Sequence, residues 1–305
     1  MSSCDRVLFE RPDLPRLIKQ HTVVDLHFHS NHSDGMNNIR KIADKVRKLG
    51  IGIAITDHNE ISGALEIDAY DDIFSIPGIE ITAAEGSHLL VYFYNTKDLQ
   101  KFYKTVVVPH MGSGVMSSLA LNMEQIIQCA RTYECVIIFA HPYCAIYTGV
   151  CNIQFSKEEL DRLFDMVHGV EVINASNLNK WNLKCSVLGF NLDKAMVGGS
   201  DGHSLGQMGR AVTYAKCAWN RRDFLDAICR HENQVAGKEI HLLRKVTSNG
   251  LKLRHNFNNC PDLMEKHFRY SCKVINFKSK SLRSNVKRRL NQHINSTSLR
   301  SYFGI

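Results

Sequence analysis

The chain has 305 residues, of which 44% are hydrophobic and 22% are charged, a composition typical of a folded globular protein. No apolar run approaches the roughly 20 residues that a membrane-spanning helix needs. The first 20 residues carry charges of both signs instead of the apolar stretch of a signal peptide. These features argue against a membrane protein, and a cytoplasmic location is expected.

Ten cysteines could indicate a disulfide or zinc scaffold. Their spacing argues against both, because no C-x-x-C pair occurs and the cysteines stand singly. Several, such as Cys135, lie inside apolar segments. The sequence therefore predicts reduced, buried thiols, and we interpret Cys144, near His141, as structural too.

The net charge of +8 is unevenly distributed. Residues 241–305 contain 14 Lys and Arg against two acids, a net charge of +12, whereas residues 1–240 contain 24 basic and 28 acidic residues, a net charge of −4. We therefore divide the chain into a body, residues 1–240, and a basic C-terminal extension, residues 241–305. In the extension, residues 281–294 have the apolar spacing of a helix.

The predicted elements of the body alternate between short apolar strands and amphipathic helices. In chain order they are a strand at 22–27, a helix at 37–49 before Gly50, a strand at 51–56, a helix at 61–69, strands at 73–82 and 88–94 that could pair, an irregular stretch at 96–118 and a helix at 119–134. A strand at 135–140, a helix at 156–167, a strand at 169–174, a helix at 177–189, strands at 195–198 and 211–214, and a helix at 220–231 follow. Ser156 and Glu159 form a capping box.

Nearly all-apolar strands between helices are typical of a parallel sheet that is buried on both faces. About seven strand–helix units favour an α/β barrel, closed or nearly closed. In such a barrel, catalytic groups lie at the carboxyl ends of the strands.

Histidine and acidic side chains gather at these strand ends. His27 and His29 lie two residues apart at the end of the first strand, so both rings face the same way and can reach one cation. Further residues of this kind, at strand ends or in the adjoining loops, are Asp34, Asp57, His58, Glu80, His88, His141, Glu171, Asp201 and His203, and the amide Asn174 lies among them.

Each of these signals is weak when it stands alone. A single buried histidine is usually a hydrogen-bonded core residue, and an H-x-H pair often arises by chance. Together, however, nearly every predicted strand delivers such a group to the same end of the sheet. Burying these groups without partners would cost several kcal/mol each, and cations would neutralise them. The sequence therefore predicts a site for divalent cations.

Six short motifs resemble the four motifs of the PHP family, which is named for polymerase and histidinol phosphatase, in their order and spacing. They are DLHFHS at 25–30, SDG at 33–35, ITDH at 55–58, PGIE at 77–80, AHP at 140–142 and GSDGH at 199–203. The resemblance runs from about residue 23 to about residue 230. It implies a distorted (β/α)7 barrel, which is TIM-barrel-like, up to three divalent ions of Mn, Fe, Zn or Mg, and hydrolysis of phosphate esters. The small stand-alone members, which are nucleotide phosphatases or exonucleases on short nucleic acids, are the most similar group.

The resemblance also implies a role for each matching residue. A first metal ion would be bound by His27, His29, Glu80 and Asp201, a second by Glu80 with His88 and His141, and a third by Asp34, His58 and His203. Asp57 would orient the ring of a ligating histidine, since such rings usually donate their second N–H to a carboxylate.

Two cations that share a water lower its pKa towards roughly 7. A metal-bridging hydroxide is therefore expected to attack phosphorus in line, while the cations neutralise charge on the phosphate oxygens. Arg210, just past the last motif, is a candidate clamp for a phosphate oxygen, and a surface arginine is the alternative. Lys180 and Trp181 could line a pocket for a base or sugar, and a packed tryptophan is the alternative.

The predicted function is hydrolysis of a phosphoric ester, by a phosphatase or a phosphodiesterase, in a phosphorylated small molecule, a nucleotide or a short nucleic acid. The alternative is a metal-bound regulatory or structural module with little turnover. The basic extension could guide a polyanionic substrate. A solvated helix face is the alternative there, because no series of aromatic residues accompanies the charges.

Overall fold

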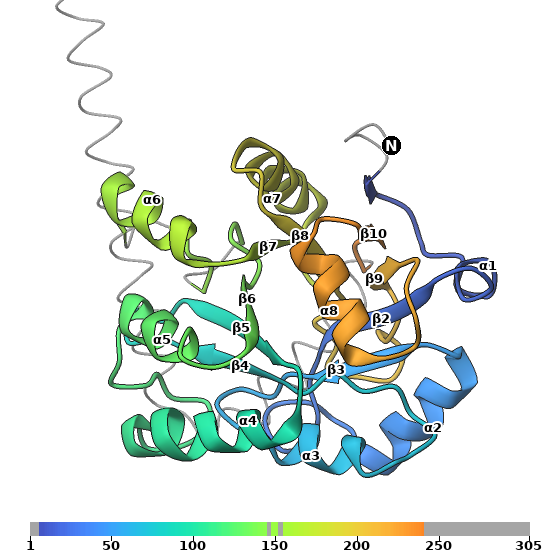
Figure 1. The fold of residues 1–305 in the computed structure, drawn as a ribbon, viewed down its shortest axis with the longest axis horizontal. Helices are drawn as coiled ribbons and strands as arrows, with labels where there is room; N and C mark the ends of the chain where they lie inside the picture. Colours follow the sequence, from blue (N-terminus) through green and yellow to red (C-terminus); the bar gives the residue numbers. More distant parts are fainter. Residues whose placement is uncertain (1–5, 145–147, 152–154, 241–305) are drawn as a thin grey trace, which may run out of the picture. The chain divides into compact units, whose positions relative to one another are not determined.

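The computed structural model describes residues 6–144, 148–151 and 155–240 (Figure 1). The predicted basic extension at 241–305, with its helical segment, lies outside these residues. In the described ranges, no helix combines the length and the apolar character that crossing a membrane requires.

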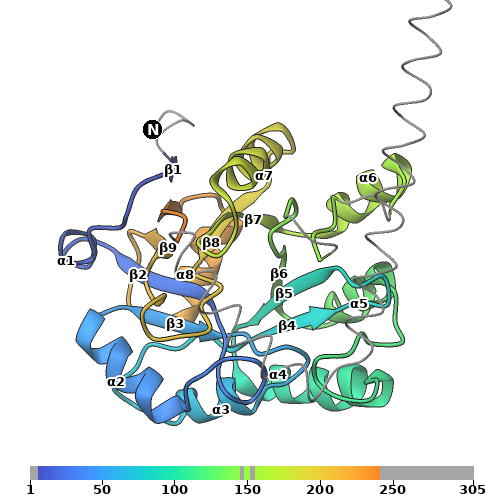
Figure 2. The same ribbon diagram turned by 180° about the vertical axis from the view of Figure 1, so that it is seen from behind.

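Two five-stranded sheets form the framework, with helices around them (Figures 1 and 2). The first sheet has the order β1 (Val7–Leu8), β10 (Gln234–Gly237), β9 (Ala211–Ala215), β2 (Thr22–Phe28) and β3 (Gly52–Ile55). The second has the order β4 (Gly78–Thr82), β5 (His88–Phe93), β6 (Cys135–Phe139), β7 (Gly169–Asn174) and β8 (Ala195–Gly199). The α-helices are α1 (Leu14–Leu17), α2 (Ile39–Leu49), α3 (Ser62–Asp68), α4 (Thr96–Phe102), α5 (Met123–Ala130), α6 (Lys157–Met166), α7 (Asn179–Asn191) and α8 (Arg221–Cys229).

Both sheets are mixed, so the prediction of a purely parallel sheet is wrong at two places. Strand β5 is antiparallel to both β4 and β6, and β9 is antiparallel to both β2 and β10. Five residues connect β4 to β5, which suffices for a hairpin but not for the crossover that a parallel pair requires. The expected pairing of these two strands is confirmed.

The two sheets meet at two places. Isolated parallel bridges join Ile53 to Ser75 and His58 to Glu80 beside β3 and β4, and a third joins Phe28 at the end of β2 to Gly202 after β8. Beyond the Phe28–Gly202 bridge, strands β8 and β2 do not form an extended ladder, because β9 pairs with that edge of β2 over Thr22–Val24. The described residues therefore form an α/β fold of two linked mixed sheets, and the closed form of the expected (β/α)7 barrel is not present among them.

The inner faces of both sheets share one apolar core. It includes Val24 and Leu26 of β2, Leu90 of β5, Ile138 of β6 and Val197 of β8, and α8 packs against it. A larger core cluster on the outer faces packs against helices including α2, α3 and α5. The strands are consequently buried on both faces, as their apolar sequences predict.

Several elements end where local signals place them. Gly50, in the left-handed conformation at φ 65°, ends α2, and the capping box of Ser156 and Glu159 is confirmed at the start of α6. The helix expected at 119–134 is shorter, because Asn122 caps α5 and the preceding backbone bonds β4 instead, with Leu119 N–H donating to Thr82 O at 2.9 Å. Helix α4 and the short strands β1 and β10 are not predicted from the sequence.

Candidate metal centre

A β-bulge in β2 turns two histidines towards the inner face. Between Asp25 and Phe28 the strand advances three residues while β3 advances two. Leu26 lies in the inner core and Phe28 in the outer core. The extra residue places His27 and His29 on the inner side as well, and their Nε2 atoms lie 3.2 Å apart.

A second bulge, in β7, places two polar side chains at the same centre. Glu171 pairs with Val197 and Ile173 with Gly198, so β7 also carries one extra residue. Glu171 and Asn174, three residues apart, therefore both face inwards. Asn174 Nδ2 donates to Glu171 Oε2 at 3.0 Å and to Asp201 Oδ2 at 3.1 Å.

Glu80, on β4, lies at the centre of the cluster. Its carboxylate oxygens lie 2.9–3.4 Å from nitrogen atoms of five imidazoles, those of His27, His29, His58, His88 and His141. Burial would raise the pKa of Glu80, but the imidazoles around it outweigh burial and hold it well below its usual range. The carboxylate is therefore ionised, as a metal ligand must be.

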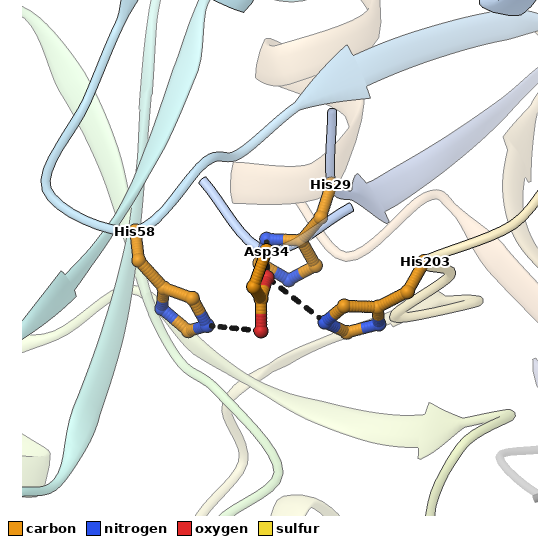
Figure 3. Close-up of side chains that lie close together, drawn as sticks. All are labelled: His29, Asp34, His58 and His203. Atoms are coloured by element: carbon orange, nitrogen blue, oxygen red, sulfur yellow. Dashed lines mark ion pairs between the residues drawn. The ribbon is translucent and has the colours of Figure 1, made fainter. Parts of the chain in front are cut away.

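Asp34 forms a second focus, shown in Figure 3, where His58 and His203 point at it from opposite sides. Its Oδ1 lies 3.1 Å from His203 Nε2 and 3.7 Å from His29 Nδ1, and its Oδ2 lies 3.8 Å from His58 Nε2. The ring of His29 stacks on those of His58 and His203, with centroids 4.6 and 4.5 Å apart. The loop after β2 thus brings a carboxylate to three imidazoles.

All nine predicted ligands converge, and their assignment to individual ions stays a prediction. Three sets have ligand atoms within 4.8 Å of one another: His27, His29 and Asp201; His58, Glu80 and His88; and His29, Asp34, His58 and His203. His29 and His58 each belong to two sets. His141 joins through Glu80, whose Oε1 lies 3.4 Å from its Nε2.

The donor set fits divalent cations. Glu80 Oε2, His29 Nδ1 and His58 Nδ1 are buried and have no hydrogen-bonding partner within the described part of the chain, which is unusual for buried polar atoms. Burial lowers the pKa of His58 to about 3, so this ring is neutral and can donate a lone pair. Imidazoles and carboxylates together suit Zn, Mn or Fe.

The orienting role expected of Asp57 falls to Glu171 in the structure. Asp57 accepts hydrogen bonds from Ser30 N, Ser30 Oγ and Ser33 Oγ at 2.8, 2.5 and 2.5 Å, so it fixes the loop that carries Asp34. Glu171 Oε1 instead lies 2.9 Å from His27 Nδ1. The sequence signal for this role is an acidic residue inside an otherwise apolar strand.

Backbone geometry also marks the centre. His141 and Asp201 adopt positive φ values of 30° and 47°, which are uncommon for non-glycine residues and cluster at functional sites. A Cβ on Gly199 would lie 2.4 Å from His27 Cβ, and one on Gly35 would lie 2.3 Å from His29 O. Only glycine therefore allows the approach of these segments to the two histidines.

Two further predicted residues lie beside these elements. Arg210 Nε donates to Gly206 O at 3.4 Å, and its role as a phosphate clamp stays a prediction. Cys144 Sγ lies 3.4 Å from Thr148 Oγ1, and no disulfide links the cysteines of the described ranges.

Solved structures similar to this chain share its fold at low sequence identity. One is an endonuclease Q in complex with a 27-mer duplex that has an abasic lesion at the active site; it is 17% identical, with a TM-score of 0.60 over 72% of this chain and 60% of that chain. Another is a two-domain protein from Bacteroides vulgatus that contains a predicted PHP-like metal-dependent phosphoesterase; it is 18% identical, with a TM-score of 0.54 over 79% of this chain and 72% of that chain.

Sequence comparison gives the family. An uncharacterized protein of Methanocaldococcus jannaschii is 28% identical over 167 residues, which are 50% of this chain and 81% of that protein. Residues 25–168 match the model of the PHP domain, and residues 190–232 match the model described as PHP-associated. Residues 25–168 thus form a PHP domain, and residues 190–232 form a PHP-associated segment.

Proposed function

We propose that this protein is a metal-dependent phosphoesterase that hydrolyses phosphate esters of nucleotides or short nucleic acids. One observation carries the proposal: six histidines and three carboxylates from separate loops and strands converge on Glu80 and Asp34. A stable fold alone does not need such a cluster, because each buried ionisable group costs free energy unless it is paired.

The chain's own residues would hold and orient the cations. The nine ligands are His27, His29, Asp34, His58, Glu80, His88, His141, Asp201 and His203. Glu171 fixes the ring of His27, and Asn174 holds the Asp201 carboxylate through its Nδ2. When bound, divalent cations activate water and neutralise the charge that develops on a phosphoryl group.

The substrate class is supported by charge and by similarity of fold. A phosphate ester is an anion, and two or three divalent ions among three carboxylates leave a positive centre that attracts it. The endonuclease Q structure shows that a protein of similar fold engages nucleic acid at its active site. Guidance of a nucleic acid by residues 241–305 stays a prediction, since these residues lie outside the described ranges.

The test is hydrolysis of p-nitrophenyl phosphate and bis(p-nitrophenyl) phosphate with Mn²⁺, Zn²⁺ or Mg²⁺ added in turn. We expect release of p-nitrophenol that requires metal and disappears in His27→Ala. His21→Ala is the matched control, because His21 packs edge-on against Tyr214, outside the cluster, and should leave activity unchanged. A protein that binds metal but hydrolyses neither compound would support the alternative of a regulatory or structural module.

A further inference from the structure

Two aromatic rings and two lysines form a cluster beside the metal centre, here called the aromatic–lysine cluster: Tyr143, Lys180, Trp181 and Lys184. Lys184 Nζ lies between the two rings, 4.7 Å from the centroid of Trp181 and 5.7 Å from that of Tyr143. Lys180 Nζ lies 5.2 Å from the Trp181 centroid. Three of the four residues come from the first half of α7.

Covalent and hydrogen-bonded links tie the cluster to the metal ligands. Tyr143 follows His141 by two residues, so their Cα atoms lie within about 7 Å of each other. Tyr143 O accepts a hydrogen bond from Asn177 Nδ2 at 2.7 Å, and Asn177 N donates to Asn174 Oδ1 at 3.1 Å. Asn174 in turn donates to Asp201. The cluster therefore has a fixed position next to the centre.

Within the described ranges, neither lysine of the cluster has an anionic partner. Lys180 and Lys184 are exposed and lie four residues apart on one face of α7. Among the residues that the structure describes, their ammonium groups contact aromatic rings and no carboxylate. Like charges at this spacing disfavour the helix slightly, and cation–π contacts at exposed sites are weak. Both ammonium groups are thus available to a ligand.

Trp181 carries an indole N–H donor that no described residue accepts. Its Nε1 is buried, yet it has no acceptor within the described ranges, whereas buried indole N–H groups usually find one. The side chain as a whole is only half-buried. The indole therefore leaves part of its ring open to a ligand, next to the two lysines.

We propose that the aromatic–lysine cluster binds the base and neighbouring phosphate of a nucleotide unit while its scissile phosphate lies at the metal centre. The aromatic rings stack on the base, and the lysines contact the phosphate of the adjacent nucleotide. This inference rests on the proposed function, which places the scissile phosphate at the metal centre. A free mononucleotide and a single-stranded nucleic acid both offer a base and a phosphate. Substitution of a lysine distinguishes these two ligands.

The first test measures binding by tryptophan fluorescence. The chain has two tryptophans, so Trp219→Phe leaves Trp181 as the only one; Trp219 packs against Phe74 instead. We expect AMP to quench the emission on mixing and ribose 5-phosphate, which lacks the base, to leave it nearly unchanged. Equal effects of the two compounds would overturn the inference, whether or not the protein turns either over.

The second test compares KM and kcat. We expect Trp181→Ala to raise KM for AMP roughly 5- to 100-fold and to leave the values for ribose 5-phosphate within about twofold. Trp181→Phe should restore most of the loss, and Trp181→Leu, which has no ring to stack on the base, replaces the alanine variant if that one fails to fold. A similar loss for both substrates would show that Trp181 is structural and contradict the inference.

A third test substitutes a lysine to distinguish a mononucleotide ligand from a single-stranded nucleic acid. Lys184→Met should weaken binding of a four-residue oligothymidylate and reduce the slope of its salt dependence by about one counterion, with a smaller effect on AMP. No effect on either ligand would remove the lysines from the proposal. Absence of metal-dependent hydrolysis with every phosphate ester would instead refute the proposed function, which the fluorescence test does not depend on.

Discussion

The inner and outer parts of the metal centre differ in how they are supported. The inner residues His27, His29 and Glu80 have side chains at most 1% exposed and lie in strands or at a strand end. The outer residues His88, Asp201 and His203 are 13%, 19% and 10% exposed and lie at the start of a strand or in the loop after β8. The inner part is therefore fixed by the sheets, and the outer part is open to substrate and to metal exchange.

The largest expected effect separates these two parts directly. His27→Ala should lower metal-dependent activity by about a thousandfold or more, because His27 lies beside both Asp201 and Glu80 and cations contribute several kcal/mol to the transition state. His203→Ala removes one ligand of the outer set and should cost less. Rates at saturating Mn²⁺ measure both variants. Equal losses of activity in the two variants would contradict the distinction between inner and outer residues.

A smaller effect is expected behind the inner ligands. Glu171→Gln keeps the shape of the side chain but removes the charge that faces His27 Nδ1. Substitutions of such supporting residues typically cost 10- to 100-fold in metal affinity, so we expect a loss of about that size. Competition with a fluorescent chelator gives the affinity. An unchanged affinity would mean that β7 contributes only packing.

The third prediction concerns stability. In Gly199→Ala the new methyl group would lie 2.4 Å from His27 Cβ and 2.6 Å from His27 N, so we expect a loss of about 1–3 kcal/mol in the free energy of unfolding. Gly206→Ala is the matched control, since no atom lies within 4 Å of the position that its methyl group would take, and it should stay within about 0.5 kcal/mol. Urea denaturation compares them. Similar stabilities would contradict the close approach of β8 to β2.

The smallest effect is expected at the loop between β2 and α2. Asp57→Asn weakens the hydrogen bonds to Ser30 and Ser33, so Asp34 should be less well placed and the ion beside Asp34 less tightly bound, by about tenfold or less. Asp44→Asn, on the exposed face of α2, should change nothing. Metal titration by calorimetry resolves the two. A loss of metal affinity larger than that of Glu171→Gln would contradict the account, because it would make Asp57 more important for metal binding than Glu171.

Much of the metal centre can be predicted from the sequence, because its ligands follow short apolar strands. The pair His27 and His29, for example, ends a strand that apolar side chains define without any tertiary information. The PHP resemblance, now confirmed by the family models, adds the assignment of the ligands to individual ions, which stays a prediction.

Other features depend on pairings between distant segments. The bulges in β2 and β7 arise from registers with β3 and β8, and the occupation of the β2 edge by β9 arises from residues almost 200 positions away. The position of Glu171 beside His27 follows from the register of β7. Spacing along one strand cannot reveal such features, because it does not fix which strand lies alongside.

Bound cations are the most direct sign of the proposed centre, and elemental analysis of the purified protein after loading with Mn²⁺, Fe²⁺ or Zn²⁺ measures them. We predict two or three ions per chain, with His27→Ala losing at least one and His21→Ala retaining all. A chain that binds no transition metal under any loading condition would contradict the claim that these histidines and carboxylates form a metal centre.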